Sequence, residues 1–220
     1  MGRIKFWHRA EPMAEKPLAG KHVIITRARK QAGSLTQRIE ALGGAATELP
    51  TIEIEAPKDF AALDAALARV ESYDWLIITS VNSIDPLLAR LAHMGKSVAA
   101  LSLLKVAAVG AQTATRLAAA GISNALVPAR YQAEGLLDAL DAESMRGKRV
   151  LIPQAGQARD VLAVTLRQWG AEVDVVEAYR TVLPVVDSTA IKRQLHAGEI
   201  DIVTFTSSST VINFAQLFDG

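Results

Sequence analysis

Cysteine is absent from the 220 residues of this sequence, and neither sign of charge is in clear excess. Without a thiol the chain has no disulfide, no thiolate nucleophile and no cysteine-ligated zinc or iron–sulfur site, which fits a cytoplasmic protein. The formal net charge is only +1, so we expect no nucleic-acid partner, because nucleic acids are bound by strongly basic surfaces. No apolar run approaches the roughly 20 residues of a membrane span, and we expect no membrane association.

The common cofactor and metal motifs are missing as well. The sequence has neither the GxxxxGK[ST] phosphate loop nor the GxGxxG dinucleotide fingerprint, and it lacks the GxSxG elbow of serine hydrolases. Its four histidines, His8, His22, His93 and His196, show no metal-ligand spacing. We therefore expect no cofactor and no metal.

An internal repeat is the most informative feature that the sequence does contain. Residues 20–43 align without a gap with residues 147–170, and residues 74–80 align with residues 201–207 at the same offset of 127. Such a repeat indicates two similar α/β halves, with a possible site between them. The alternative is a chance alignment in a chain rich in alanine, valine and leucine.

The repeat also predicts a segment that the sequence does not show. The stretch 106–114 should have a copy that begins near position 233, whereas the sequence ends at Gly220. We expect either that the second half is short by design or that the chain is incomplete.

Short apolar runs alternate with helical patterns along most of the chain. Continuous apolar runs are typical of parallel strands that are covered on both faces, and Leu35, Ile39 and Leu42 recur at helical spacing. The pattern predicts an α/β fold of open parallel sheets. The expected strands are 22–26, 75–79, 105–109, 124–127, 149–152 and 201–206, and the expected helices are 31–42, 82–93, 112–120, 133–141, 158–168 and 208–218.

Two segments, 51–55 and 172–175, alternate polar and apolar residues instead. Alternation indicates a strand with one face in solvent and one face buried, whereas a central parallel strand is buried on both faces. We expect both segments to lie at or beyond the edge of a sheet, where they could pair as a linker between the halves.

A series of short motifs runs through the chain in a defined order. The motifs are Ile25-Thr26-Arg27, Leu42-Gly43 with Pro50, Tyr73 to Asn82, Val109 to Ala114, Ala133 to Leu137, Ala158-Arg159-Asp160 with Leu162, Gly170 to Val173, Ala178 to Thr181 and Phe205 to Ser209. In order and spacing this series resembles the uroporphyrinogen-III synthase family, whose enzymes invert the fourth ring in tetrapyrrole synthesis. The resemblance covers about residues 18–218.

The resemblance implies two similar Rossmann/flavodoxin-like parallel-sheet domains joined by a two-stranded linker. By analogy the first domain is 18–50 plus 183–220 and the second is 51–182. Residues 1–17 are mixed in charge and have no apolar h-region, so we expect them to be a flexible extension. The family carries a Gly-Pro-x-Thr segment in its first domain, which this sequence lacks. We therefore expect that the protein either continues beyond Gly220 or is inactive as it stands.

The resemblance also implies an activity. The family's substrate is hydroxymethylbilane, a linear tetrapyrrole with eight carboxylates; the enzyme removes a hydroxyl, inverts the last ring through a spiro intermediate and closes the macrocycle. We expect a cofactor-independent lyase that works as a monomer, with this small molecule as its partner. The alternatives are a non-catalytic, hinged binder of small anions and a degenerate synthase-like domain that serves assembly or regulation.

Candidate substrate-binding groups fall where the expected strands end and helices begin. Backbone N–H groups at helix N-termini can bind carboxylates there, together with hydroxyl groups. Each candidate also has a structural alternative, because Ser and Thr cap helices and the two arginines could be solvated surface charges. The candidates are Arg27, Thr79, Ser80, Gly110, Arg159, Thr206, Ser207 and Ser208.

Tyr179 and Thr113 are the candidates for chemistry. Tyr179 follows the second alternating segment, near the cleft expected between the domains, and a phenol is protonated at neutral pH and can donate to a leaving hydroxyl. Thr113 lies where a polar group would face that cleft, although it could also cap or pack its helix. Tyr179 could equally be a strand tyrosine that packs at a domain edge. The reaction would then need no proton donor from it, because the substrate's own pyrrole can expel the hydroxyl while the enzyme holds the substrate in a reactive conformation.

Overall fold

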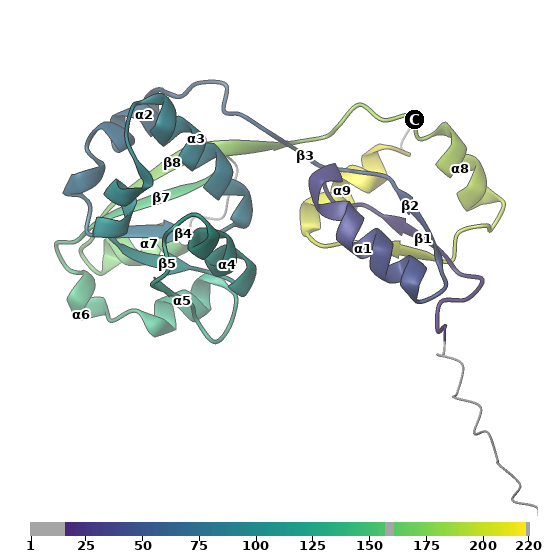
Figure 1. Cartoon of the computed structure of the whole chain (residues 1–220), viewed down its shortest axis with the longest axis horizontal. Coiled ribbons are helices and arrows are strands. Elements are labelled where there is room, and N and C mark those ends of the chain that lie inside the picture. Colours follow the sequence, from purple (N-terminus) through teal and green to yellow (C-terminus); the bar gives the residue numbers. More distant parts are fainter. Residues whose placement is uncertain (1–15, 157–160, 219–220) are drawn as a thin grey trace, which may run out of the picture. The chain divides into compact units, whose positions relative to one another are not determined.

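A computed structural model describes residues 16–156 and 161–218 of the chain (Figure 1). The chain divides into two compact units, with boundaries between Glu53 and Ile54 and between Val182 and Leu183. Unit 1 therefore contains both ends of the chain, and unit 2 contains the middle. Of the expected flexible extension, residues 1–17, only Lys16 and Pro17 are among the described residues.

Unit 1 is built on a three-stranded parallel sheet with the order β2-β1-β9 (Figure 1). Val23 and Ile25 of β1 pack into one apolar cluster with α1, and Ile24 packs on the other face with residues of α8 and α9. The strands are β1 (His22–Ile25), β2 (Ala45–Glu48) and β9 (Ile202–Thr204), and the helices are α1 (Arg29–Ala41), α8 (Thr189–His196) and α9 (Ser208–Gln216).

Unit 2 is built on a six-stranded sheet with the order β3-β8-β7-β4-β5-β6. From β8 to β6 every neighbouring pair is parallel. The strands are β3 (Glu53–Glu55), β4 (Trp75–Ile78), β5 (Lys105–Ala108), β6 (Ala125–Leu126), β7 (Arg149–Ala155) and β8 (Glu172–Val182). The helices are α2 (Ala61–Ala68), α3 (Ile84–His93), α4 (Ala111–Ala119), α5 (Ala133–Ala139), α6 (Ala142–Met145) and α7 (Val161–Gln168), with 3-10 turns η1 (Val70–Ser72), η2 (Val81–Ser83) and η3 (Val98–Leu103).

The apolar strands of unit 2 are covered on both faces, as the sequence predicts. Leu76 and Ile78 of β4 belong to one buried cluster with α2, α3 and α4, whereas Ile77 belongs to a second cluster with α5 and α7. Side chains alternate between the two faces of a strand, so an uninterrupted apolar run fills both clusters. The predicted α/β architecture with parallel sheets is confirmed. Within the described ranges, no helix has the length and apolar character needed to cross a membrane.

The offset of 127 found in the sequence also relates the strand pairs of the two units. His22 pairs with Ala45 in unit 1, and Arg149 pairs with Glu172 in unit 2. On the other side of the central strand, Val23 pairs with Ile202, and Val150 pairs with Trp75. The pairings on both sides of β1 therefore have the same register as those on both sides of β7. The strand trio β2-β1-β9 corresponds to β8-β7-β4, residue for residue.

The two alternating segments differ in their position. The first forms β3, which is the edge strand of the six-stranded sheet, but the second opens β8, which lies between β3 and β7. The edge position is therefore confirmed for β3, and for residues 172–175 it stays a prediction, because the side-chain contacts between β3 and β8 lie near the other end of β8, where Arg180 donates to Glu55 and to the carbonyl of Ala56. Their polar residues lie near the amino end of β8, where Asp174 is bonded to Tyr73 and Arg69 and Glu172 is exposed. The alternation reflects the exposure of this amino end of β8 to solvent.

Candidate active site

The carboxyl ends of parallel strands lie along one edge of a sheet, and this edge is the usual ligand site of open α/β folds. In unit 2 this carboxyl edge carries Thr79 and Ser80 after β4, and Gly110 after β5. Tyr179 and Ala155 form the last residue pair between β8 and β7, at the carboxyl end of β7. Four of the predicted site residues are thus brought to one edge of one sheet.

A polar row crosses the same edge on one face of the sheet. Ile77, Ile152 and Val175 belong to one apolar cluster on three neighbouring strands. Two residues further along each strand come Thr79, Gln154 and Glu177, and the last two are register partners. Because side chains two apart share a face, these polar groups continue the apolar face at its carboxyl end. Gln154 is buried.

Sequence reasoning missed Gln154 and Glu177. The repeat contains a signal for the first, because Arg27 maps onto Gln154 at the offset of 127. Applying the offset to the predicted binding residue would have identified Gln154. Glu177 lies in an apolar strand two residues before Tyr179, and a charged residue within a buried strand is itself a signal.

Tyr179 lies beside a β-bulge. The register between β7 and β8 shifts between Gln154 and Ala155, so that Ala155 pairs with Tyr179 and skips Ala178. A bulge changes which face of the sheet the following side chains occupy, and bulges are frequent next to active sites. Tyr179 is 6% exposed, and its carbonyl accepts a hydrogen bond from Gly156 N–H at 3.2 Å.

The hydroxyls after β4 and β9 act as helix caps. Ser80 Oγ accepts a hydrogen bond from Asn82 N–H at 3.2 Å, and Ser207 Oγ accepts one from Thr210 N–H at 3.3 Å. Ser207 forms a capping box with Thr210. These two serines are repeat equivalents at the offset of 127, so the capping alternative holds in both units. The residues next to the two serines differ in exposure: Thr79 is half-buried, whereas Thr206 and Ser208 are exposed.

Gly110 and Thr113 lie in the first part of α4 and differ in accessibility. Gly110 is the N-cap residue in an extended conformation, with φ −147°. A Cβ added there would meet nothing within 4 Å, so neither backbone strain nor packing within the protein explains the glycine. Thr113 is 5% exposed and lies on the buried face of α4 with Leu117, which agrees with the packing alternative.

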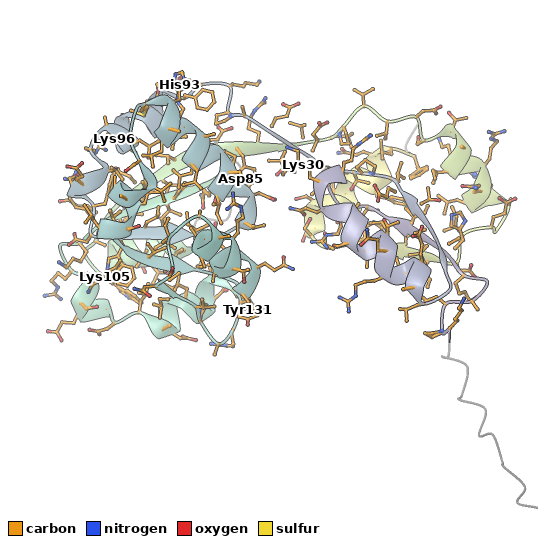
Figure 2. All side chains as sticks on the ribbon, in the orientation of Figure 1. Lys30, Asp85, His93, Lys96, Lys105 and Tyr131 are labelled. Atoms are coloured by element: carbon orange, nitrogen blue, oxygen red, sulfur yellow. The ribbon has the colours of Figure 1, made fainter. Side chains whose placement is uncertain are left out.

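In unit 1, cationic side chains follow the carboxyl end of β1. Thr26, directly after β1, is fully buried and donates from Oγ1 to the carbonyl of Thr204 at 2.6 Å. Arg27 follows and is half-buried, and its Nε is buried with no hydrogen-bond partner among the described residues. Arg29 opens α1 as an exposed charge, and the exposed Lys30 follows it (Lys30 is labelled in Figure 2). Arg159, the other predicted arginine, lies outside the described residues.

Several basic residues of unit 2 lie at the opposite, amino end of its sheet, among them Arg69, Lys105 and Arg149. Lys105 opens β5 (Figure 2). Its Nζ lies 5.6 Å from the ring centre of Trp75. Tyr73, just before β4, donates to Asp174 at 2.5 Å, and Arg69 donates to the same oxygen at 3.0 Å. Burial, followed by this contact with Asp174, raises the pKa of Tyr73 to about 12. These groups stabilise the amino end and lie away from the carboxyl edge.

The family of the chain follows from its relatives. The family model described as "Uroporphyrinogen-III synthase HemD" matches residues 33–220. This chain belongs to the uroporphyrinogen-III synthase family. The family predicted from the order of the sequence motifs is thereby confirmed. Within the described ranges, the structure gathers no three His, Cys, Asp or Glu side chains that could together hold a metal ion.

Individual members of the uroporphyrinogen-III synthase family match over most of the chain. "Uroporphyrinogen-III synthase" of Synechococcus elongatus is 36% identical over 209 residues, which cover 93% of this chain and 77% of the relative. "Putative uroporphyrinogen-III synthase" of Methanothermobacter thermautotrophicus is 35% identical and covers 88% and 76%. The fold resembles a crystal structure of a mutant uroporphyrinogen III synthase from Thermus thermophilus, with a TM-score of 0.67 and 19% identity over 89% of this chain and 76% of that chain.

Proposed function

We propose that this chain is a cofactor-independent lyase that cyclises hydroxymethylbilane to uroporphyrinogen III, with loss of water and inversion of the last ring. The observation that carries the proposal is the family match over residues 33–220. It favours the enzyme over a binder of small anions and over a degenerate domain, because the similar relatives are named as synthases.

The chemistry of the carboxyl edges supports this substrate. A molecule with eight carboxylates needs many donors, and backbone N–H groups with hydroxyls can supply them where strands give way to helices. In unit 1 the half-buried Arg27, with its unsatisfied Nε, is suited to a carboxylate. In unit 2 the open space in front of Gly110 leaves the N-terminus of α4 accessible to a ligand.

The roles of the individual residues form part of the proposal. Tyr179 donates a hydrogen bond to the leaving hydroxyl, and Thr113 assists from α4. Carboxylates of the substrate are bound by Arg27, Thr79, Ser80, Gly110, Arg159, Thr206, Ser207 and Ser208. The serines can do this while they cap, because a hydroxyl that accepts from a backbone N–H can still donate its own proton.

The same proposal includes the organisation of the chain. We assign two similar Rossmann-like domains, near 18–50 plus 183–220 and near 51–182, with the chain crossing between them next to β3 and after β8. The register shared by the strand trios of the two units supports their similarity. We further propose a monomer in the cytoplasm.

Product analysis tests the function. Hydroxymethylbilane closes spontaneously to the type I isomer, so the protein is incubated with enzymatically generated hydroxymethylbilane and the isomers are separated. We expect type III to dominate. Type I alone, from protein that is folded by circular dichroism, would leave the binder or the degenerate domain as the remaining functions.

A further inference from the structure

Glu177 carries a buried carboxylate oxygen without a hydrogen-bond donor. Its Oε1 has no hydrogen-bond partner among the described residues, and the nearest cationic atom is Arg180 Nε at 3.9 Å. That guanidinium is already engaged, since Nε donates to the carbonyl of Ala56 at 3.2 Å and a terminal nitrogen donates to Glu55 at 2.9 Å. Arg180 thus offsets part of the charge of Glu177, but within the described residues Oε1 receives no hydrogen bond, which is costly for a buried atom.

The backbone directly after β7 lies close to this carboxyl group. A Cβ added at Gly156 would lie 2.8 Å from both Cδ and Oε2 of Glu177. Such a distance is shorter than any ordinary contact, so a larger residue at 156 would displace the carboxylate. Glycine at this position thus allows the close approach of the Glu177 carboxyl group, and its φ does not lie in the positive range that would itself favour glycine.

Glu177 is also placed where the ligand is expected. It ends the polar row with Gln154 and Thr79 at the carboxyl edge of unit 2. A negative group there disfavours binding of a substrate with eight carboxylates. Its presence is understandable if it contacts a part of the substrate that donates hydrogen bonds or becomes positively charged during the reaction.

We propose that Glu177 Oε1 accepts a hydrogen bond from the N–H of the pyrrole that bears the hydroxymethyl group, an inference that rests on the proposed function. As the carbon–oxygen bond breaks, its electron pair leaves with the hydroxyl, which takes the proton of the Tyr179 phenol and departs as water, and the phenolate regains a proton from solvent. The nitrogen lone pair forms a carbon–nitrogen double bond within the ring, the ring double bonds shift so that a double bond forms to the exocyclic carbon, and positive charge develops on the ring N–H. The carboxylate stabilises that charge without exchanging electrons or protons.

The substitution Glu177→Gln tests the inference, because it keeps the shape of the side chain and removes its charge. We expect kcat to fall about 100-fold, while KM for hydroxymethylbilane stays the same or decreases. A purely structural role would not separate kcat from KM in this direction. The matched control is Glu172→Gln, on the exposed amino end of the same strand, which should leave kcat within about twofold.

The substitution Gly156→Ala keeps the charge but moves the carboxylate, so it should lower kcat to a similar degree. Type III product from the wild-type protein with near wild-type kcat in either variant would overturn the inference alone. Absence of type III product from the folded wild-type protein would overturn the proposed function and the inference together. Melting temperatures of all variants show whether each has folded.

Discussion

Lys148 Nζ donates to Asp74 Oδ1 at 2.9 Å, while Arg149 N–H donates to Asp74 Oδ2 at 2.9 Å. Unit 1 repeats this arrangement: Lys21 Nζ donates to Asp201 Oδ1 at 2.7 Å and His22 N–H donates to Asp201 Oδ2 at 2.8 Å. The partners are again related by the offset of 127. We call each arrangement a Lys–Asp clasp. Both clasps join the amino ends of two neighbouring strands, β4 to β7 and β9 to β1.

The clasps predict a loss of stability in acid. Hydrogen bonds from Arg149 N–H and Lys148 lower the pKa of Asp74 from its ordinary value of 3.8, and those from Lys21 and His22 N–H lower that of Asp201. The stabilisation is therefore complete above that value and is lost as pH falls through the folded pKa values. We expect the urea midpoint of the wild-type protein to decrease between about pH 5 and about pH 3.

The double variant Asp74→Asn with Asp201→Asn isolates the contribution of the clasps. Its urea midpoint should start lower at the higher pH and change less on acidification. The exposed Glu71→Gln serves as control and should follow the wild-type protein. Equal slopes for the double variant and the wild-type protein would contradict this explanation of acid sensitivity.

Two glycines within helices are expected to respond in opposite ways to alanine. A Cβ at Gly135, in α5, would lie 2.1 Å from the carbonyl oxygen of Arg130, whereas a Cβ at Gly33, in the exposed part of α1, would meet nothing within 4 Å. Gly135→Ala should destabilise by roughly 2 kcal/mol or more, because a backbone atom must move. Gly33→Ala should stabilise by about 0.5–1 kcal/mol. Urea unfolding measures both, and a neutral Gly135→Ala would contradict the close approach.

Sequence periodicity predicted the elements whose residues carry a strong local pattern. The run of β4 fills two apolar clusters, so its burial is readable without a structure. The helix α2 was not predicted, although Leu63, Ala66 and Leu67 are its buried residues, because an alanine-rich segment has little contrast between its faces. The strand β2 (Ala45–Glu48) was also missed, because it is short and its residues are at least partly exposed.

The site was predictable only in part, for a physical reason. Strand ends can be located from apolar runs, and this placed Thr79, Ser80 and Gly110 at one edge. The bulge at Gln154 and the approach of Gly156 to Glu177 depend on the register between β7 and β8. Register is a property of two strands that are distant in the sequence, so periodicity within either strand does not contain it.

Tyr179→Phe tests the predicted proton donor. The substitution removes only the hydroxyl, so we expect kcat to fall by about tenfold or more with an unchanged melting temperature. Tyr73→Phe is the matched control, because its hydroxyl bonds Asp174 at the amino end of the sheet. That control should lower stability and leave kcat nearly unchanged. Undiminished turnover in Tyr179→Phe would remove the phenol from the mechanism.

Gly110→Ala tests whether a ligand approaches the N-terminus of α4. Apart from its chain neighbours, the added methyl meets none of the described residues within 4 Å, and φ is −147°, so the melting temperature should change little. If a substrate carboxylate binds the backbone N–H groups of this helix, the methyl occupies its path, and KM should rise about fivefold or more. Gly33→Ala adds a methyl in equally open space on α1 and should leave KM unchanged. Equal KM values in both variants would show that the substrate does not contact Gly110, and the capping geometry of α4 would then serve the fold alone.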